Sequence, residues 1–144
     1  MLDFENQDNA VYIAVYPFIN LVASKEQGIK ILEEASECRE AYDVLAKTAM
    51  YLETNEVEDG DEQLQYSAHR FAEELCDTIQ ALINTLVAVV GTAEAAQEII
   101  NEWMYGITTK NAQRGYYGEF EEQEEEEQES EEDNTDDADG RISE

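Results

Sequence analysis

Two acidic clusters carry the clearest chemical signal in this sequence. Glu33-Glu34-x-x-Glu37 and Glu74-x-x-Asp77 each place two carboxylates three residues apart. Three residues are almost one turn of an α-helix, so the carboxylates of each pair share one side of the helix. If two such helices pack side by side, four or five carboxylates converge, and a hard divalent cation such as Mg²⁺ would offset their repulsion. The pattern predicts a metal-dependent site for phosphate chemistry.

The first cluster lies on a segment with the periodicity of a long helix, from about residue 25 to residue 52. At about 100° per residue, Glu34 falls at the edge of its apolar stripe and Glu37 just beyond it. We therefore expect both carboxylates to lean towards the interior of a helical bundle. The apolar positions advance by three or four residues and are Leu32, Ala35, Cys38, Tyr42, Leu45, Ala49 and Leu52.

The second cluster belongs to another expected helix. A polar, acidic stretch at 54–63 (TNEVEDGDEQ) interrupts the helical pattern as a loop would. A helix is expected over about 64–90, and from Thr78 onward it is apolar on nearly every side, which indicates cover by several neighbours. Asp77 stands at the start of that apolar run, where a carboxylate needs a partner.

A small basic group follows a third expected helix. Gly91-Thr92 breaks the second helix, and the Thr92 side chain can cap the next one. Lys110 and Arg114 lie one turn apart near its end, with Asn111 between them. The simpler interpretation is that the helix dipole favours cations at a C-terminus. In a chain with two acidic clusters, however, this group is also suited to binding a ligand phosphate.

These residues together resemble a known family, the MazG-like all-α nucleoside triphosphate pyrophosphohydrolases, which are relatives of dimeric dUTPases and phosphoribosyl-ATP pyrophosphohydrolase. The two acidic clusters are similar to that family's EExxE and ExxD motifs. Residues 31–37 (ILEEASE) resemble its apolar-EE-small-x-E helix. Lys110-Asn111-x-x-Arg114-Gly115 is similar to its downstream K-N-x-x-R segment.

The resemblance covers about residues 18–117. It implies an all-α, MazG-like bundle of about four helices in a domain at 1–118, assembling as an oligomer. One departure is the spacer of 36 residues between Glu37 and Glu74, which is longer than is usual between these motifs. The acidic stretch at 54–63 is the expected insertion.

The activity implied by the resemblance is hydrolysis of a nucleoside triphosphate to a monophosphate and pyrophosphate. Water would attack in line at phosphorus and split the α–β bond, with Mg²⁺ as the cofactor and Mn²⁺ as a possible substitute. Glu33 and Glu37 are the implied catalytic residues, Glu33 by orienting the water or adding a ligand. The implied metal ligands are Glu34, Glu37, Glu74 and Asp77, and the implied phosphate-binding residues are Lys110, Asn111 and Arg114.

Charge is distributed unevenly along the chain. It has 36 acidic and 8 basic residues and a net charge of -28, and residues 119–144 hold fifteen of the acids and one base, Arg141. This low-complexity stretch predicts a disordered, solvated tail. The rest of the chain is still acidic and would repel phosphate backbones, so we expect no binding of nucleic acid through a basic surface.

We expect neither membrane association nor a zinc site. The N-terminus has no basic region, and the apolar run at 11–23 is short and contains Pro17. A cytoplasmic protein is therefore the default expectation. Cys38, Cys76 and His69 lack zinc-ligand spacing, which favours buried or half-buried free thiols and a surface histidine.

Apolar residues beyond one face of each helix predict self-association. With Tyr116, Tyr117 and the 11–23 segment, they form more apolar surface than three helices can cover, which favours a homodimer or homotetramer. The main alternative to an enzyme is a helical interaction protein whose acidic tail binds a basic partner or mimics nucleic acid. The simplest role of that tail is solubility. Turnover of nucleoside triphosphates separates the two hypotheses.

Overall fold

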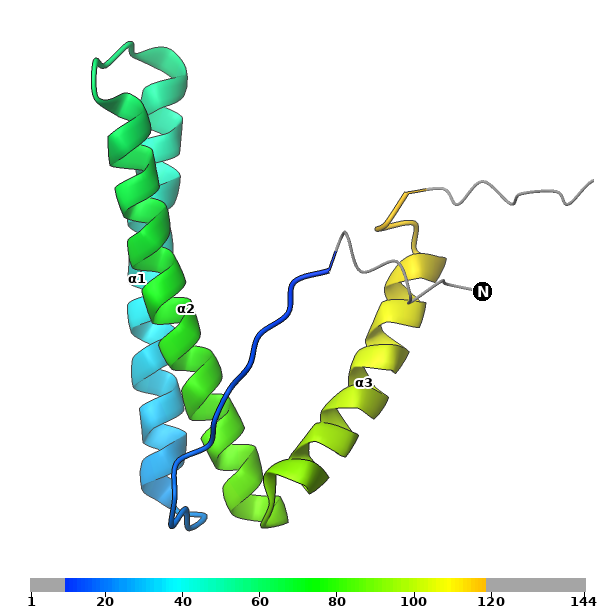
Figure 1. Ribbon diagram of the computed structural model, residues 1–144. Coiled ribbons are helices and arrows are strands. Elements are labelled where there is room, and N and C mark those ends of the chain that lie inside the picture. Colours follow the sequence, from blue (N-terminus) through cyan, green and yellow to red (C-terminus); the bar gives the residue numbers. More distant parts are fainter. Residues whose placement is uncertain (1–9, 119–144) are drawn as a thin grey trace, which may run out of the picture.

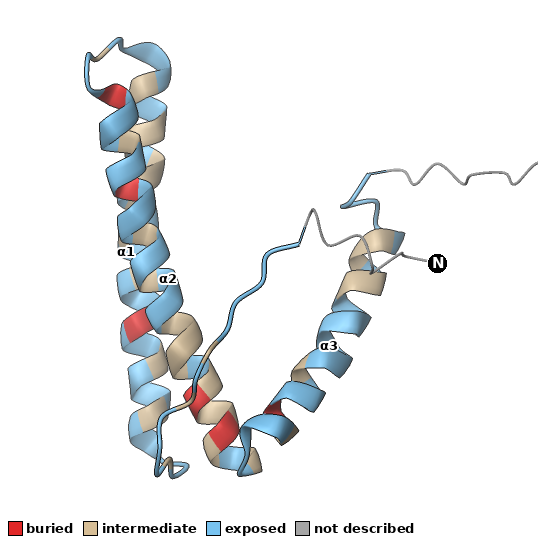
Figure 2. Ribbon diagram, in the orientation of Figure 1, coloured by how far each residue is buried: buried red, intermediate tan, exposed pale blue. Residues whose placement is uncertain are grey.

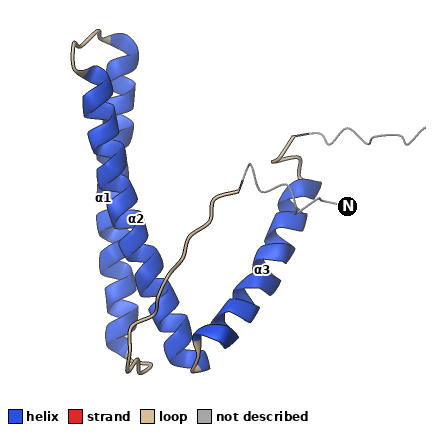
Figure 3. Cartoon of the chain, viewed as in Figure 1, coloured by secondary structure: helices blue, strands red, loops and turns tan. Residues whose placement is uncertain are grey.

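The computed structural model describes residues 10–118, and within them the protein contains helices and no strand (Figure 3). The helices are α1 (Lys25–Thr54), α2 (Gly60–Val90) and α3 (Ala93–Gln113). The antiparallel helices α1 and α2 form a long hairpin, and α3 diverges from it to make an open V (Figure 1). The all-α prediction is confirmed, although this part of the chain has three helices rather than about four. The predicted acidic tail lies outside the described residues.

The helix boundaries follow from local capping. The Ser24 backbone N–H donates to the side-chain oxygen of Gln27 at 3.3 Å, at the start of α1. Gly91 ends α2 in the left-handed region, at φ 94°, which favours glycine. The Thr92 hydroxyl accepts a hydrogen bond from the Ala95 N–H at 3.1 Å and so caps α3. The predicted break and the predicted Thr92 cap are both confirmed.

The predicted loop at 54–63 shortens to 55–59, because α1 includes Thr54 and α2 begins at Gly60, four residues earlier than the pattern suggested. The Gln63 side chain donates to the Asp59 carboxylate at 2.9 Å, and its backbone N–H donates to the Asp59 carbonyl at 3.0 Å. Asp61 and Glu62 occupy the first turn, where the positive end of the helix dipole favours acids. Acidity that looked typical of a loop therefore stabilises a helix start.

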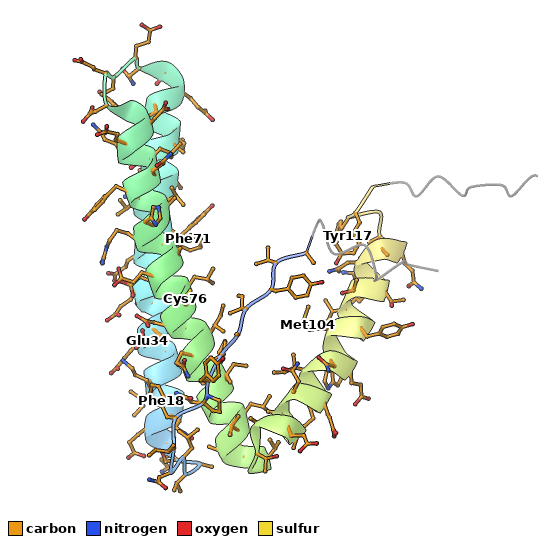
Figure 4. The ribbon with its side chains drawn as sticks, in the orientation of Figure 1. Phe18, Glu34, Phe71, Cys76, Met104 and Tyr117 are labelled. Atoms are coloured by element: carbon orange, nitrogen blue, oxygen red, sulfur yellow. The ribbon has the colours of Figure 1, made fainter. Side chains whose placement is uncertain are left out.

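The segment before α1 is extended and lies along α2. Asn84, which is buried, accepts hydrogen bonds through its side-chain oxygen from the Phe18 N–H and from Gln80 Nε2, both at 3.0 Å. Gln80 Nε2 also donates to the Tyr16 carbonyl at 3.0 Å. Figure 4 shows Phe18 beside α2. Two polar side chains of α2 thus hold the backbone of this segment, while most of its apolar side chains remain exposed.

The helices α2 and α3 meet only near their break. Across it they are bent by 112°, and α3 contacts α2 but not α1 within the described range. No single described helix is long and apolar enough to cross a membrane, and only α2 and α3 taken together as a bent pair meet that criterion. Most residues of α3 are exposed in the part of the chain that the structure describes (Figure 2).

The core formed by residues 10–118 is small. Among the described hydrophobic residues only Val87 and Ala96 are buried, and no large side chain there is fully buried. Leu32, which the periodicity placed in the apolar stripe of the first helix, is 72% exposed, and Trp103 on α3 is 68% exposed. Each helix of a two-helix hairpin has only one side covered, so an apolar stripe that extends beyond that side stays in solvent.

Candidate functional site

The antiparallel pairing of α1 and α2 sets the two acidic motifs opposite each other. Tyr42 and Phe71 mark the register, because their ring centroids lie 5.8 Å apart across the hairpin. Five residues back along α1 is Glu37, and three residues forward along α2 is Glu74. The register of the hairpin therefore brings the two motifs together.

Three carboxylates form the candidate site, which we call the carboxylate cluster: Glu34, Glu37 and Glu74. One oxygen from each lies within 4.8 Å of the others. Glu34 is 6% exposed and is the only buried acid among the described residues, whereas Glu37 is exposed and the Glu74 side chain is 13% exposed. The expected lean of Glu34 towards the interior is thus confirmed, whereas Glu37, for which the same was expected, is exposed, and Figure 4 shows Glu34 on α1 beside α2.

Two basic side chains contact the cluster from one turn earlier on each helix. Lys30 forms an ion pair with Glu34, whose hydrogen bond and charge raise the pKa of the Lys30 ammonium. Arg70 reaches Glu74 at 3.3 Å and Glu73 at 2.8 Å. Each helix thus supplies one cation to offset part of the cluster's negative charge.

The carboxyl of Glu74 has a raised pKa. Its burial raises its pKa above the ordinary value of 4.5, the Arg70 guanidinium opposes that change, and the charges of Glu37, Glu73 and Asp77 raise the pKa further. The ionised form is therefore disfavoured by desolvation and by its neighbours. A cation placed among these oxygens would reverse that balance.

This perturbation predicts a pH-dependent gain in stability for Glu74→Gln. A carboxyl whose folded pKa is raised binds protons more tightly in the folded state, so its contribution is present below the unfolded pKa and is lost as pH rises through the folded pKa. The variant lacks this loss. We expect its melting temperature minus that of the wild type to increase between about pH 4 and pH 7, measured by thermal unfolding. A difference that is constant or falls with pH would contradict the prediction.

Two predicted acidic residues lie near the cluster without joining it. Asp77 follows Glu74 by almost one turn of α2, but its side chain is exposed and outside the three-carboxylate group. Glu33 precedes Glu34 on α1 and is also exposed and outside the group. The structure therefore brings together three of the four predicted metal ligands.

The residues predicted to bind phosphate are separated from the carboxylate cluster within one chain. Lys110, Asn111 and Arg114 lie at the C-terminal end of α3, which diverges from the hairpin (Figure 1). In Figure 4, Met104 on α3 and Tyr117 beyond its end lie well away from Glu34. Lys110 and Arg114 are exposed, and Asn111 is half-buried. The structure of one chain thus does not unite the basic and acidic halves of the predicted site.

A groove between α1 and α2 extends from the cluster along the hairpin. It is a cavity of about 530 Å³ that opens beside two members of the cluster. A second cavity of about 410 Å³ continues it towards the α1–α2 loop. The first is lined by, among others, Glu37, Ala41, Val44, Tyr66, Arg70 and Glu74.

Sequence reasoning missed Lys30, Arg70 and Tyr66. The two cations had a signal, because each stands four residues before a cluster carboxylate on a helix. Tyr66 had none, since its place in the groove depends on the register of the hairpin. Of the other predicted residues, Cys38 is a half-buried free thiol, Cys76 is an exposed one, contrary to the prediction, and His69 is exposed as predicted.

Comparison with known proteins does not add to this geometry. The chain was compared with protein-family models, with curated proteins and with solved structures, and no match was found.

Proposed function

We propose that this protein is a Mg²⁺-dependent nucleoside triphosphate pyrophosphohydrolase with a MazG-like helical domain, acting in the cytoplasm. The observation that carries the proposal is the meeting of the two acidic motifs, which are 36 residues apart in sequence, in one carboxylate cluster. Exposed acids often lie together without an ion. Here, however, the group includes a buried glutamate and adjoins a groove of a size typical of small-molecule sites.

The donors of the cluster suit the proposed cofactor. Magnesium prefers carboxylate oxygens and retains several waters, and Glu34, Glu37 and Glu74 offer three such oxygens from two helices. These are the residues that would hold it, with Asp77 one turn away as a further ligand in our proposal. When bound, the ion supplies charge neutralisation for the triphosphate and a more acidic water.

The chain's own residues then bind and orient the substrate. Arg70, which lines the groove and already contacts Glu74, can donate hydrogen bonds to phosphate oxygens once its carboxylate partners are engaged elsewhere. Glu33 is the proposed residue that orients the attacking water. Water adds to phosphorus, the α–β bond breaks, and nucleoside monophosphate and pyrophosphate leave with release of a proton. Lys110, Asn111 and Arg114 remain predicted phosphate ligands that this chain does not bring to its own cluster.

An oligomer is part of the proposal. Exposed apolar side chains occur on all three helices and on the segment before α1. A homodimer or homotetramer would cover them, because a second copy presents the same unsatisfied faces. The alternative is a non-enzymatic helical interaction protein whose acidic tail binds a basic partner or mimics nucleic acid.

A nucleotide panel tests the proposal. The full-length protein should release pyrophosphate from one or more of the common ribo- and deoxyribonucleoside triphosphates with Mg²⁺, at a lower rate with Mn²⁺ as the substitute, and at no measurable rate with excess chelator. Absence of turnover on every nucleotide with either metal would contradict the enzyme and favour the interaction protein.

A further inference from the structure

One end of the groove beside the carboxylate cluster carries an aliphatic and an aromatic side chain that the chemistry at phosphorus does not use. Glu37 and Glu74 line one end, and Val44 and Tyr66 line the other. Seven residues of α1 separate Glu37 from Val44, which corresponds to about 10 Å along the helix axis. A ligand held by its phosphates at the cluster would therefore place its remaining part against these two side chains.

Tyr66 occupies a special place in this groove. It lines both the cavity of about 530 Å³ and the neighbouring cavity of about 410 Å³, and it is 70% exposed. The adjacent Ser67 is buried, and its hydroxyl lies 3.4 Å from that of Thr48 across the hairpin. The contact between Ser67 and Thr48 thus forms the floor of the groove, while the ring of Tyr66 is exposed at its side.

We propose that Tyr66, with Val44 opposite on α1, forms the nucleobase subsite of this groove and binds the base by stacking. This inference rests on the proposed function, because the phosphates at the cluster define which way the ligand lies. An aromatic ring offers a flat face to any base, and stacking of this kind depends little on the pattern of base-edge hydrogen bonds. Nucleotides with different bases should therefore bind with modest differences in affinity.

Equilibrium binding separates this inference from catalysis. The probes are non-hydrolysable α,β-methylene analogues of the four common deoxynucleoside triphosphates, and inorganic tripolyphosphate, which has no base, all with Mg²⁺. Calorimetry on the full-length protein compares the wild type with Tyr66→Ala and Tyr66→Phe. Tyr51→Ala is the matched control, because Tyr51 is another exposed tyrosine of the hairpin that lines neither of these two cavities.

Removal of the ring should weaken nucleotide binding about tenfold and leave tripolyphosphate binding unchanged. Tyr66→Phe and Tyr51→Ala should bind like the wild type. Unchanged nucleotide affinity in Tyr66→Ala, an equal loss in Tyr66→Phe, or wild-type nucleotide binding no tighter than that of tripolyphosphate would each overturn the subsite. Nucleotide binding without turnover would instead refute the proposed hydrolase while leaving the subsite intact.

Discussion

Glu74→Gln should reduce pyrophosphate release at least about a hundredfold, because the neutral amide removes a charged oxygen from the carboxylate cluster where charge develops during phosphoryl chemistry. The same loss is expected for Glu37→Gln. Steady-state kinetics with the best nucleotide of the panel measures it. Glu74→Gln is the sharper variant, since the raised pKa of this carboxyl predicts that the variant gains stability relative to the wild type as pH rises. Thermal unfolding at the assay pH then separates a loss of chemistry from unfolding.

Glu73→Gln is the control for this result. Glu73 is the neighbouring acid on α2, its side chain is 60% exposed, and it bonds the same Arg70 while lying outside the cluster. The control variant makes the same chemical change one residue away and should keep most of the wild-type rate. Equal rates for the wild type, Glu74→Gln and Glu73→Gln would show that the carboxylate cluster does not carry the chemistry.

The second large effect concerns assembly. The full-length protein should have a light-scattering mass of at least twice its 16.4 kDa chain mass. Trp103→Glu should shift that mass towards the monomer and lower the melting temperature, because a charge would replace a 68% exposed indole on an uncovered face of α3. Loss of a tryptophan at the centre of a protein interface can cost about 2 kcal/mol or more, so the shift should be visible at roughly micromolar concentration.

Asn101→Glu is the matched control for Trp103→Glu. It adds the same charge to the same helix two residues away, which is about 200° around the axis. Asn101 is exposed and accepts a hydrogen bond from Gln97 at 2.7 Å, which a glutamate can also accept. A wild-type protein that is monomeric across this concentration range would contradict the prediction, as would equal dissociation in both variants.

Local patterns predicted the elements of the fold well. Apolar periodicity located α1 and most of α2, and the Gly91-Thr92 break followed from backbone and capping preferences. The early start of α2 was missed because acidic residues are favoured both in loops and in the first turn of a helix. Burial of Glu34 was predictable from its angular position on one helix.

Relations between helices were harder to predict. The inclusion of Glu74 in the cluster and the exclusion of Asp77 depend on the register and side-chain directions of the hairpin, which spacing along one helix does not determine. The distance of Lys110 and Arg114 from the cluster depends on the 112° bend after α2. The helical spacing of apolar residues on α3 includes Trp103, but this spacing does not show whether the same chain or another chain covers the indole.

The product mixture of the wild-type protein tests the central claim most directly. Full-length protein is incubated with a deoxynucleoside triphosphate and Mg²⁺, and phosphorus NMR follows the products over time. We predict equal amounts of nucleoside monophosphate and pyrophosphate, with neither formed in excess chelator. Nucleoside diphosphate with inorganic phosphate, or an unchanged triphosphate for every base and sugar, would contradict a pyrophosphohydrolase built on Glu34, Glu37 and Glu74.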